Sequence, residues 1–268
     1  MIPKKIHYCW FGGNPLSELA EKCIQSWKKM CPDYEIIEWN EKNYDINKSI
    51  YIQEAYKEKK WAFVSDYARL DIIYNQGGFY LDTDVELLKS LDCFYDFDCV
   101  LAQETSGYIA TGLGFGAIPK HDAIKAMLQE YDKVRFIISE GLYDNLPCPQ
   151  RNTLPFKKNG YIPFENNVQT ILGATIFPPE YFCPLNYETD EMNITKNTVS
   201  IHHYNASWIS EEEREIEKLK QCNSSIFSKI ILLKKEYNVK IKNPSIKKFF
   251  IFICGKIKKK LKMGGFYE

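Results

Sequence analysis

The sequence predicts a globular α/β fold with a mainly parallel central sheet, and three observations support this. Short runs of aromatic and branched residues, typical of strands, alternate along the chain with segments in which apolar residues recur at helical spacing. Aromatic residues make up 15% of the 268 residues, and 35 basic side chains balance 35 acidic ones, which excludes a disordered or fibrous chain. The longest apolar run, Phe249–Cys254, is far shorter than the roughly 20 residues of a membrane-spanning helix.

The chain is expected to begin with a strand, a helix and a second strand. An aromatic-rich run predicts the first strand over residues 5–11, which Gly12-Gly13 ends in a turn. Apolar residues at helical spacing predict a helix over 16–30. Branched and aromatic residues then predict a strand over 34–39.

A second helix is predicted over residues 62–75, where apolar residues cover most of the helix surface before Gly77-Gly78 stops it. The short apolar strand 79–81 follows and runs directly into Asp82-Thr83-Asp84. The same criteria predict further strands at 99–103, 113–118 and 198–202 and further helices at 122–134 and 211–222.

Asp82 and Asp84 form the strongest local signal for chemistry. Residues two apart on an extended strand project to the same side, with Cα atoms about 7 Å apart, so both carboxylates can address one site. Two carboxylates alone would repel each other, whereas Mg²⁺ or Mn²⁺, bound together with the phosphate oxygens of a nucleotide, removes that conflict. The alternative is a polar turn with solvated acids, but the position directly after an apolar strand favours the metal site.

Three charged residues interrupt the otherwise apolar helix at 62–75. Asp66 and Arg69 lie three residues apart and therefore share a face, and Asp71 follows them. An unpaired buried charge costs several kcal/mol, so this group must either pair internally or meet a polar ligand.

Aromatic and imidazole side chains follow two other predicted strands. Trp10 lies where the first strand meets the glycine turn, at the edge of a parallel sheet where ligands collect, although core packing is the simpler explanation. His202 and His203 end the strand at 198–202, and one of the two imidazoles would complete a metal shell. The sequence does not distinguish between them.

These motifs together resemble a known family. Residues 2–13 (Ile-Pro-Lys-Lys-Ile-His-Tyr-Cys-Trp-Phe-Gly-Gly), 63–71 (Phe-Val-Ser-Asp-Tyr-Ala-Arg-Leu-Asp) and 77–84 (Gly-Gly-Phe-Tyr-Leu-Asp-Thr-Asp) resemble bacterial glycosyltransferases of family 32, of the DXD sugar-binding type. The chain is more distantly similar to the catalytic domains of glucosylating toxins. The resemblance extends to about residue 208 and implies a GT-A fold, hexosyl transfer from a UDP-sugar, Mn²⁺ or Mg²⁺ as cofactor, and retention of anomeric configuration.

The resemblance also implies which residues hold the donor. Trp10 would stack on the nucleotide base, and Asp66 and Arg69 would bind the hydroxyl groups of the sugar. Ser207 and Trp208 would belong to a loop that closes over the diphosphate.

The metal and the reacting centre are implied in the same way. Asp82 and Asp84 would hold the metal and the diphosphate, with His203 as the third metal ligand. No carboxylate is an evident nucleophile for a double displacement. Glu104, near the end of the predicted strand at 99–103, is the one candidate, and a surface acid is its simpler interpretation.

Charge is distributed unevenly along the chain. Residues 229–262 contain twelve lysines and a single acid, whereas residues 1–228 carry 23 bases and 33 acids. We therefore expect a catalytic domain over 1–222 and a basic helical segment over 223–268. That segment is expected to bind an anionic membrane surface, where a glycan or lipid-linked oligosaccharide acceptor of surface or capsular polysaccharide synthesis would lie.

Compartment and partners follow from two further features of the sequence. The nine cysteines are scattered and form no Cys-x-x-Cys pair, which favours a reducing cytoplasm over a secreted disulfide framework. Nucleic-acid binding is not expected, because no base-stacking aromatic residues alternate with the lysines of the tail.

Two other functions remain open from the sequence. A phosphatase of the haloacid-dehalogenase type would use Asp82 as its nucleophile after an apolar strand, but it also needs acids late in the chain to hold magnesium. A non-catalytic sugar-binding protein would have no need for Asp82 and Asp84 together. The glycine run Gly112, Gly114, Gly116 lacks the spacing of a dinucleotide fingerprint, so a Rossmann cofactor is excluded.

Overall fold

The computed structural model describes residues 1–187 and 189–205. Residues 1–138 and 143–205 belong to one compact unit, and Ser139–Leu142 are the described part of a second. The helix predicted at 211–222, the boundary at residue 222 and the basic segment all lie outside the described residues. Within the described ranges, no helix is both long enough and apolar enough to cross a membrane.

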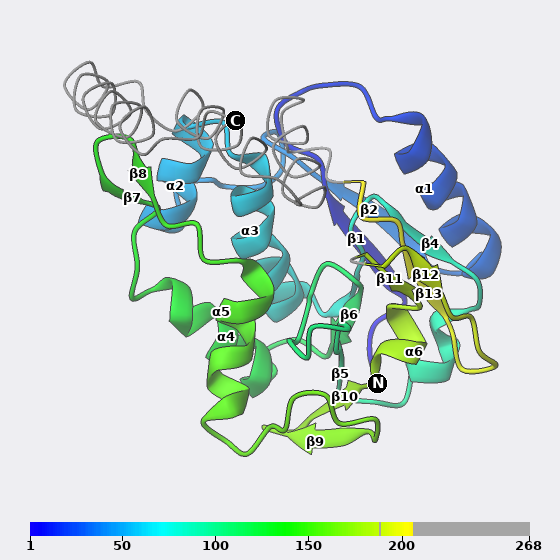
Figure 1. The fold of residues 1–268 in the computed structure, drawn as a ribbon. Coiled ribbons are helices and arrows are strands. Elements are labelled where there is room, and N and C mark those ends of the chain that lie inside the picture. The colour runs from blue at the N-terminus through cyan, green and yellow to red at the C-terminus, as the bar shows by residue number, and fades with distance from the viewer. Residues whose placement is uncertain (188, 206–268) are drawn as a thin grey trace, which may run out of the picture. The chain divides into compact units, whose positions relative to one another are not determined.

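A seven-stranded sheet forms the centre of the first unit (Figure 1). Its strands, in spatial order, are β2 (Glu35–Trp39), β1 (Lys5–Cys9), β3 (Gly78–Tyr80), β6 (Phe115–Ala117), β5 (Cys99–Ala102), β10 (Ala174–Phe177) and β9 (Gln169–Ile171). Strand β1 is parallel to β2 and β3, and β5 is parallel to β10. Only β6 and β9 run in the opposite direction, so the predicted mainly parallel α/β sheet is confirmed.

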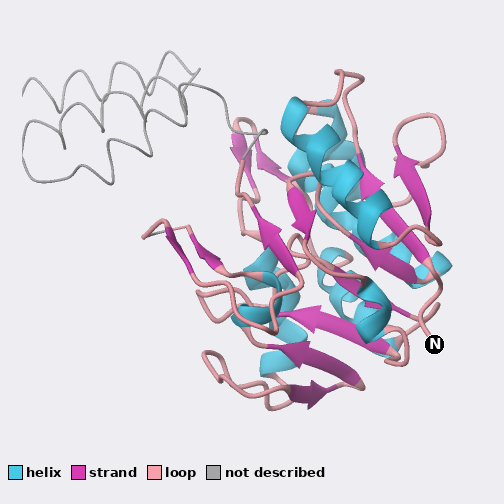
Figure 2. Ribbon diagram, turned by 90° about the vertical axis from the view of Figure 1, so that its right-hand side faces the viewer, coloured by secondary structure: helices cyan, strands magenta, loops and turns pink. Residues whose placement is uncertain are grey.

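Helices cover both faces of this sheet (Figures 1 and 2). On one face lie α2 (Ile50–Lys57), α3 (Trp61–Gln76), α4 (Asp122–Tyr131) and α5 (Cys148–Lys157), and on the other lie α1 (Glu18–Met30) and α6 (Pro179–Phe182). The sheet therefore separates two hydrophobic cores. Successive strand residues alternate between them: Phe79 packs in the core on the α1 side and Tyr80 in the core on the α3 side.

The remaining short elements lie outside the main sheet. They are a 3₁₀ helix at Leu91–Phe94 and three two-stranded pairs, namely β4 (Val85–Leu87) with β13 (Ser200–His202), β7 (Ile137–Ser139) with β8 (Leu142–Tyr143), and β11 (Leu185–Asn186) with β12 (Glu191–Met192). The pair β4–β13 is antiparallel and places His202 opposite Val85. This register brings a distant part of the chain back to the segment that follows β3.

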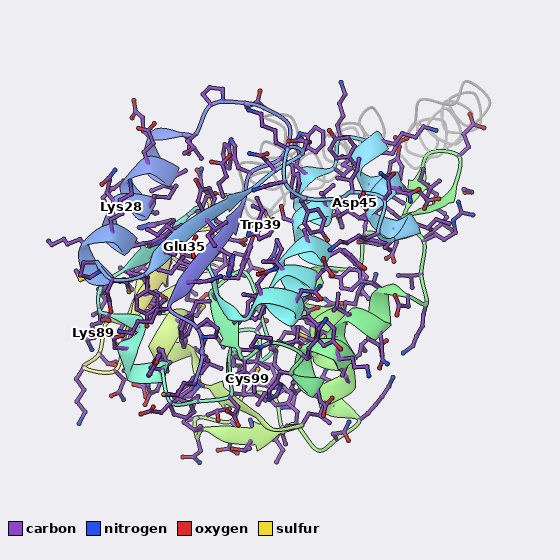
Figure 3. The ribbon with its side chains drawn as sticks, turned by 180° about the vertical axis from the view of Figure 1, so that it is seen from behind. Lys28, Glu35, Trp39, Asp45, Lys89 and Cys99 are labelled. Atoms are coloured by element: carbon purple, nitrogen blue, oxygen red, sulfur yellow. The ribbon has the colours of Figure 1, made fainter. Side chains whose placement is uncertain are left out.

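Buried His7, in β1, is hydrogen-bonded both to the end of β2 and to the turn before β3. Trp39, at the end of β2 (Figure 3), donates its indole N–H to Nδ1 of His7 at 3.0 Å. Nδ1 is therefore an acceptor, so the ring proton lies on Nε2 and is donated to the Gly77 carbonyl at 3.0 Å. The bond fixes the turn between α3 and β3, from which the chain enters the DXD segment.

Candidate active site

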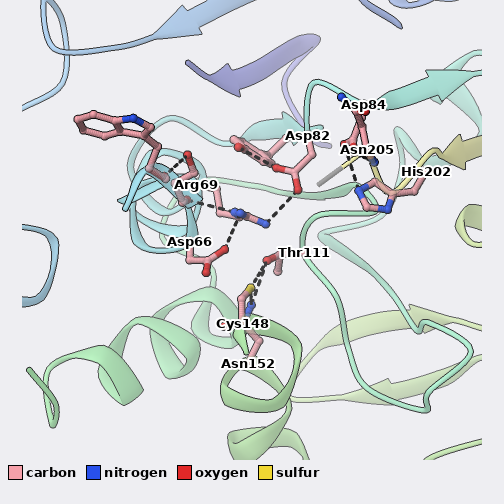
Figure 4. Close-up of polar contacts among 12 residues, drawn as sticks. Asp66, Arg69, Asp82, Asp84, Thr111, Cys148, Asn152, His202 and Asn205 are labelled. Carbon is pink, nitrogen blue, oxygen red and sulfur yellow. Dashed lines mark hydrogen bonds and ion pairs between the residues drawn. The ribbon is translucent and has the colours of Figure 1, made fainter. Parts of the chain in front are cut away.

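The two predicted carboxylates lie at the carboxyl edge of the sheet, just after β3 (Figure 4). A tight turn follows the strand, because the amide of Val85 donates to the carbonyl of Asp82 at 3.0 Å. Ligand atoms of Asp82, Asp84 and His202 all lie within 4.8 Å of one another. The predicted convergence of the two aspartates on one site is thus present in the structure.

Asp84 is held from two sides. Its Oδ1 lies 3.1 Å from Nε2 of His202, and its Oδ2 accepts the backbone N–H of Asn205 at 2.9 Å. Burial alone would raise the pKa of Asp84, but the attraction of His202 and these hydrogen bonds outweigh it and lower the pKa to about 2. The carboxylate is therefore charged at neutral pH.

His203, the predicted third ligand, does not join this group. Its Nε2 lies 3.0 Å from Oε2 of Glu86, while His202 reaches Asp84. Neighbouring residues on a strand point to opposite sides, so only one of the two imidazoles can face the aspartates. The structure therefore favours His202 over His203 as the imidazole of the site, which corrects the sequence-based choice.

Asp66 and Arg69 form a buried chain of charges with Asp82. The Arg69 guanidinium donates to Oδ1 of Asp66 at 2.6 Å and lies 3.5 Å from Oδ2 of Asp82. Its Nε donates back along α3 to the Ser65 carbonyl at 3.1 Å, and its Cζ lies over the Tyr80 ring, 5.3 Å from the ring centroid. The internal pairing of charges predicted for this helix is thus present, and it extends to Asp82 of the DXD motif.

The site carries more negative than positive charge. Burial raises the pKa of Asp66 to about 6 despite the attraction of Arg69. Burial also raises the pKa of Asp82, and the neighbouring charge of Asp84 raises it further. One buried and two half-buried carboxyl groups share one guanidinium and one imidazole, so an added cation would be stabilised here.

Asp71, the third charged residue of α3, takes no part in this site. It accepts from Nζ of Lys48 at 2.5 Å and from the Tyr44 hydroxyl at 3.0 Å. Its role is to satisfy a structural network on the far side of the helix.

The structure adds three buried residues beneath Asp66 that sequence reasoning missed (Figure 4). The thiol of Cys148, at the start of α5, opposes the rise that burial causes in the pKa of Asp66. The Asn152 amide donates to the Cys148 sulfur at 3.1 Å and to the Thr111 hydroxyl at 3.0 Å. These residues lie far from Asp66 in the sequence, and no local pattern marks them.

Gly112 explains part of the glycine run that follows β5. A Cβ atom at this position would lie 2.5 Å from Oδ2 of Asp82 and 3.3 Å from Nη1 of Arg69. The backbone therefore approaches the charged pair more closely than any other residue would allow.

Trp10 is half-buried beside the same edge, and its indole N–H donates to the Asn14 carbonyl at 2.6 Å. A cavity of about 560 Å³ adjoins this loop and is lined by residues 12–14, Glu41, Tyr56, Lys59 and Trp61. Trp10 itself does not line it. Ser207 and Trp208, the other two predicted donor-binding residues, lie outside the described residues.

Comparisons with solved structures find only distant likeness. The PaToxG glycosyltransferase is 18% identical, with a TM-score of 0.40, over 48% of this chain and 59% of that chain. A glycosyltransferase involved in glycosylating the major capsid of PBCV-1 is 13% identical, with a TM-score of 0.43, over 75% of this chain and 94% of that one. The galactosyltransferase LgtC, in complex with donor and acceptor sugar analogues, is 13% identical, with a TM-score of 0.38, over 88% and 100%. No curated protein matches the chain.

The comparison with protein families is more specific. Residues 17–106 match the family model described as glycosyltransferase sugar-binding region containing DXD motif. This region includes the charged pair of α3, the strand β3 and the two aspartates, and it supports neither the phosphatase nor the non-catalytic alternative. Residues 17–106, about a third of the chain, are thus similar to the DXD-containing sugar-binding region of glycosyltransferases.

Proposed function

We propose that this protein is a glycosyltransferase that moves a hexose from a UDP-sugar to a glycan or lipid-linked oligosaccharide, in a metal-dependent reaction that retains the anomeric configuration. The observation that carries the proposal is the convergence of Asp82, Asp84 and His202 beside the ion pair of Asp66 and Arg69. The family match and the mainly parallel sheet support the GT-A type of fold.

The donor set fits a hard divalent cation. Two carboxylates and one imidazole offer ligand atoms within 4.8 Å of one another, and Nδ1 of His202 is buried without a hydrogen-bond partner among the described residues. Carboxylate oxygens with one imidazole suit Mn²⁺ or Mg²⁺ that is also bound by phosphate. Such an ion would supply Lewis-acid stabilisation of the charge that develops on the departing diphosphate.

The protein side chains would orient the sugar and limit the freedom of the carboxylates. Asp66 offers acceptor oxygens and Arg69 offers donors, so together they can bind adjacent hydroxyl groups of a pyranose. Arg69 also forms an ion pair with Asp82 and would thereby restrict the position of that carboxylate beside the sugar. Trp10 would stack on the uracil ring next to the cavity that Gly12 and Trp61 line.

The cellular setting is part of the proposal. We place the enzyme in the cytoplasm, acting in surface or capsular polysaccharide synthesis and attached peripherally to the membrane through its basic C-terminal segment. The twelve lysines between residues 229 and 262 support this attachment, because each lysine near an anionic surface contributes about 1 kcal/mol.

Adjacent histidines provide the sharpest test of the metal site. We expect His202→Ala to weaken Mn²⁺ affinity by at least about tenfold and to reduce hydrolysis of UDP-sugars accordingly. His203→Ala is the matched control, because His203 binds Glu86 and lies outside the group. Mn²⁺ binding by calorimetry and UDP-sugar turnover, with and without EDTA, measure both effects. Equal losses in the two variants, or full activity in EDTA, would show that the metal assignment is wrong.

A further inference from the structure

The loop before β9 reaches the same edge of the sheet as the DXD aspartates. Strands β3, β5 and β10 share one direction, and β9 runs antiparallel to β10 at the outer edge of the sheet (Figure 1). The residues that precede β9 therefore lie at the carboxyl end of β10. We call residues 161–168 the edge loop.

Side-chain hydrogen bonds fix the edge loop in place. Gln169 binds both backbone groups of Ile162, accepting from its N–H at 3.0 Å and donating to its carbonyl at 2.9 Å. The Tyr161 hydroxyl lies 2.5 Å from Oε1 of Gln103 and 3.1 Å from the Gly107 carbonyl. The loop is thus closed at its ends and attached to the residues that follow β5.

An aromatic side chain projects from this fixed loop. Phe164 is 67% exposed, and its φ of +63° lies in the left-handed region that a bulky residue rarely adopts. One edge of its ring rests on Gly107, where an added Cβ would lie 2.9 Å from ring carbons. Exposure and backbone strain both cost stability, and strained residues of this kind cluster at ligand sites.

A single turn connects Phe164 to the metal group. The turn is closed by hydrogen bonds from Gly107 N to the Glu104 carbonyl and from Glu104 N to the Tyr108 carbonyl, each 2.9 Å long. At one end of the turn, burial raises the pKa of the Glu104 carboxyl group, and the charge of His202 opposes that rise. At the other end, Gly107 supports the Phe164 ring.

We infer that Phe164 is an acceptor-binding residue, whose ring stacks on the apolar C–H face of a pyranose in the acceptor glycan. The inference rests on the proposed function, because it takes the donor to lie at Asp66 and the DXD group. The C–H groups on one face of a sugar ring carry partial positive charge and meet the negative face of an aromatic ring. Glu165 and Asn167, which are hydrogen-bonded to each other at 2.8 Å, supply polar groups for hydroxyls beside the ring.

A lipid surface fits this loop less well. Between Asn159 and Thr170 the chain contains one acid, Glu165, and no base. Segments that insert into anionic membranes combine apolar residues with lysine or arginine. The charge of the loop therefore favours a neutral, hydroxyl-rich ligand.

The test uses methyl α- and β-glycosides of glucose, galactose, mannose and N-acetylglucosamine with the full chain, in the presence of UDP and Mn²⁺. Saturation-transfer NMR measures binding and identifies which sugar protons contact the protein. Phe164→Asn removes the ring while keeping a residue that tolerates positive φ, and Phe164→Trp keeps an aromatic face. Calorimetry of UDP with Mn²⁺ reports separately on the donor site.

We expect at least one glycoside to bind with saturation on the protons of one face, and to bind about three- to tenfold more weakly to Phe164→Asn than to the wild type or Phe164→Trp. In the Phe164 variants, UDP affinity should stay unchanged. The melting temperature should stay unchanged or rise. Gly107→Ala should mimic Phe164→Asn by displacing the ring. Equal glycoside binding in all variants, or no binding of any glycoside, would overturn the inference. So would a Phe164→Asn variant that binds vesicles of anionic lipid more weakly but binds glycosides as the wild type does. Failure of UDP to bind would instead count against the proposed function.

Discussion

His7 should make the stability of this protein depend on pH in a defined window. The imidazole is fully buried, accepts from Trp39 through Nδ1 and donates to Gly77 through Nε2. A second proton on Nδ1 would face the indole N–H and lose that bond. Burial, together with the charge of Lys5, lowers the pKa of His7 to about 4 even though the bond to Gly77 opposes the change.

The magnitude follows from proton linkage. The folded pKa of about 4 lies some 2.5 units below the ordinary value of 6.5, and each unit is worth 1.36 kcal/mol, which gives about 3 kcal/mol in total. Below pH 6.5 the unfolded chain binds a proton that the folded protein excludes. Stability from this residue is therefore complete above pH 6.5 and is lost progressively as the pH falls to 4.

The assay is urea unfolding of the wild type and of His7→Gln at pH 7 and pH 5. Glutamine does not titrate but can still accept from Trp39 and donate to Gly77. Carboxylates elsewhere titrate equally in both proteins, so the difference between them isolates His7. We expect the wild type to lose about 2 kcal/mol more than His7→Gln between the two pH values. Identical pH dependence in the two proteins, or an NMR titration of His7 near pH 6.5, would refute the reasoning.

Four further outcomes are expected. Gly112→Ala should reduce UDP-sugar turnover at least tenfold with little change in melting temperature, because its Cβ would meet Asp82 at 2.5 Å; normal turnover would mean that the site relaxes freely. Asp66→Asn should lower turnover about a hundredfold while UDP affinity, measured by calorimetry, stays unchanged, and a parallel loss of UDP affinity would mark Asp66 as structural. Trp10→Ala should show the reverse pattern, losing about 1–3 kcal/mol of UDP binding. The full chain should sediment with anionic vesicles at low salt, whereas a truncation at about residue 225 should not; if both stay in solution, the membrane proposal is wrong.

Local patterns in the sequence were sufficient to predict most strands of the central sheet. They also predicted the charged residues of the site, namely Asp66, Arg69, Asp82 and Asp84. The spacing of Asp82 and Asp84 predicted their common direction because side chains on an extended segment repeat every two residues. Asp66 and Arg69 share a helix face for the same kind of reason. These relations depend only on backbone geometry within one element, so they do not depend on how the rest of the chain folds.

Relations between distant segments were decided by the tertiary structure. The sequence does not distinguish His202 from His203, because the two imidazoles are chemically alike and stand next to each other at the end of one predicted strand. Pairing of β13 with β4 selects His202. The helices α2 and α5 were missed, and with α5 the contact of Cys148 with Asp66.

The position of the edge loop was likewise decided by the tertiary structure and not by local sequence. Phe164 follows a proline, and nothing in its local sequence shows that it stands at the same edge of the sheet as Asp82 and Asp84. Its position results from the antiparallel addition of β9 to β10 and from the hydrogen bonds of Tyr161 and Gln169. Strand direction within a sheet depends on which connections can close and bury both faces, a property of the whole fold rather than of any single segment.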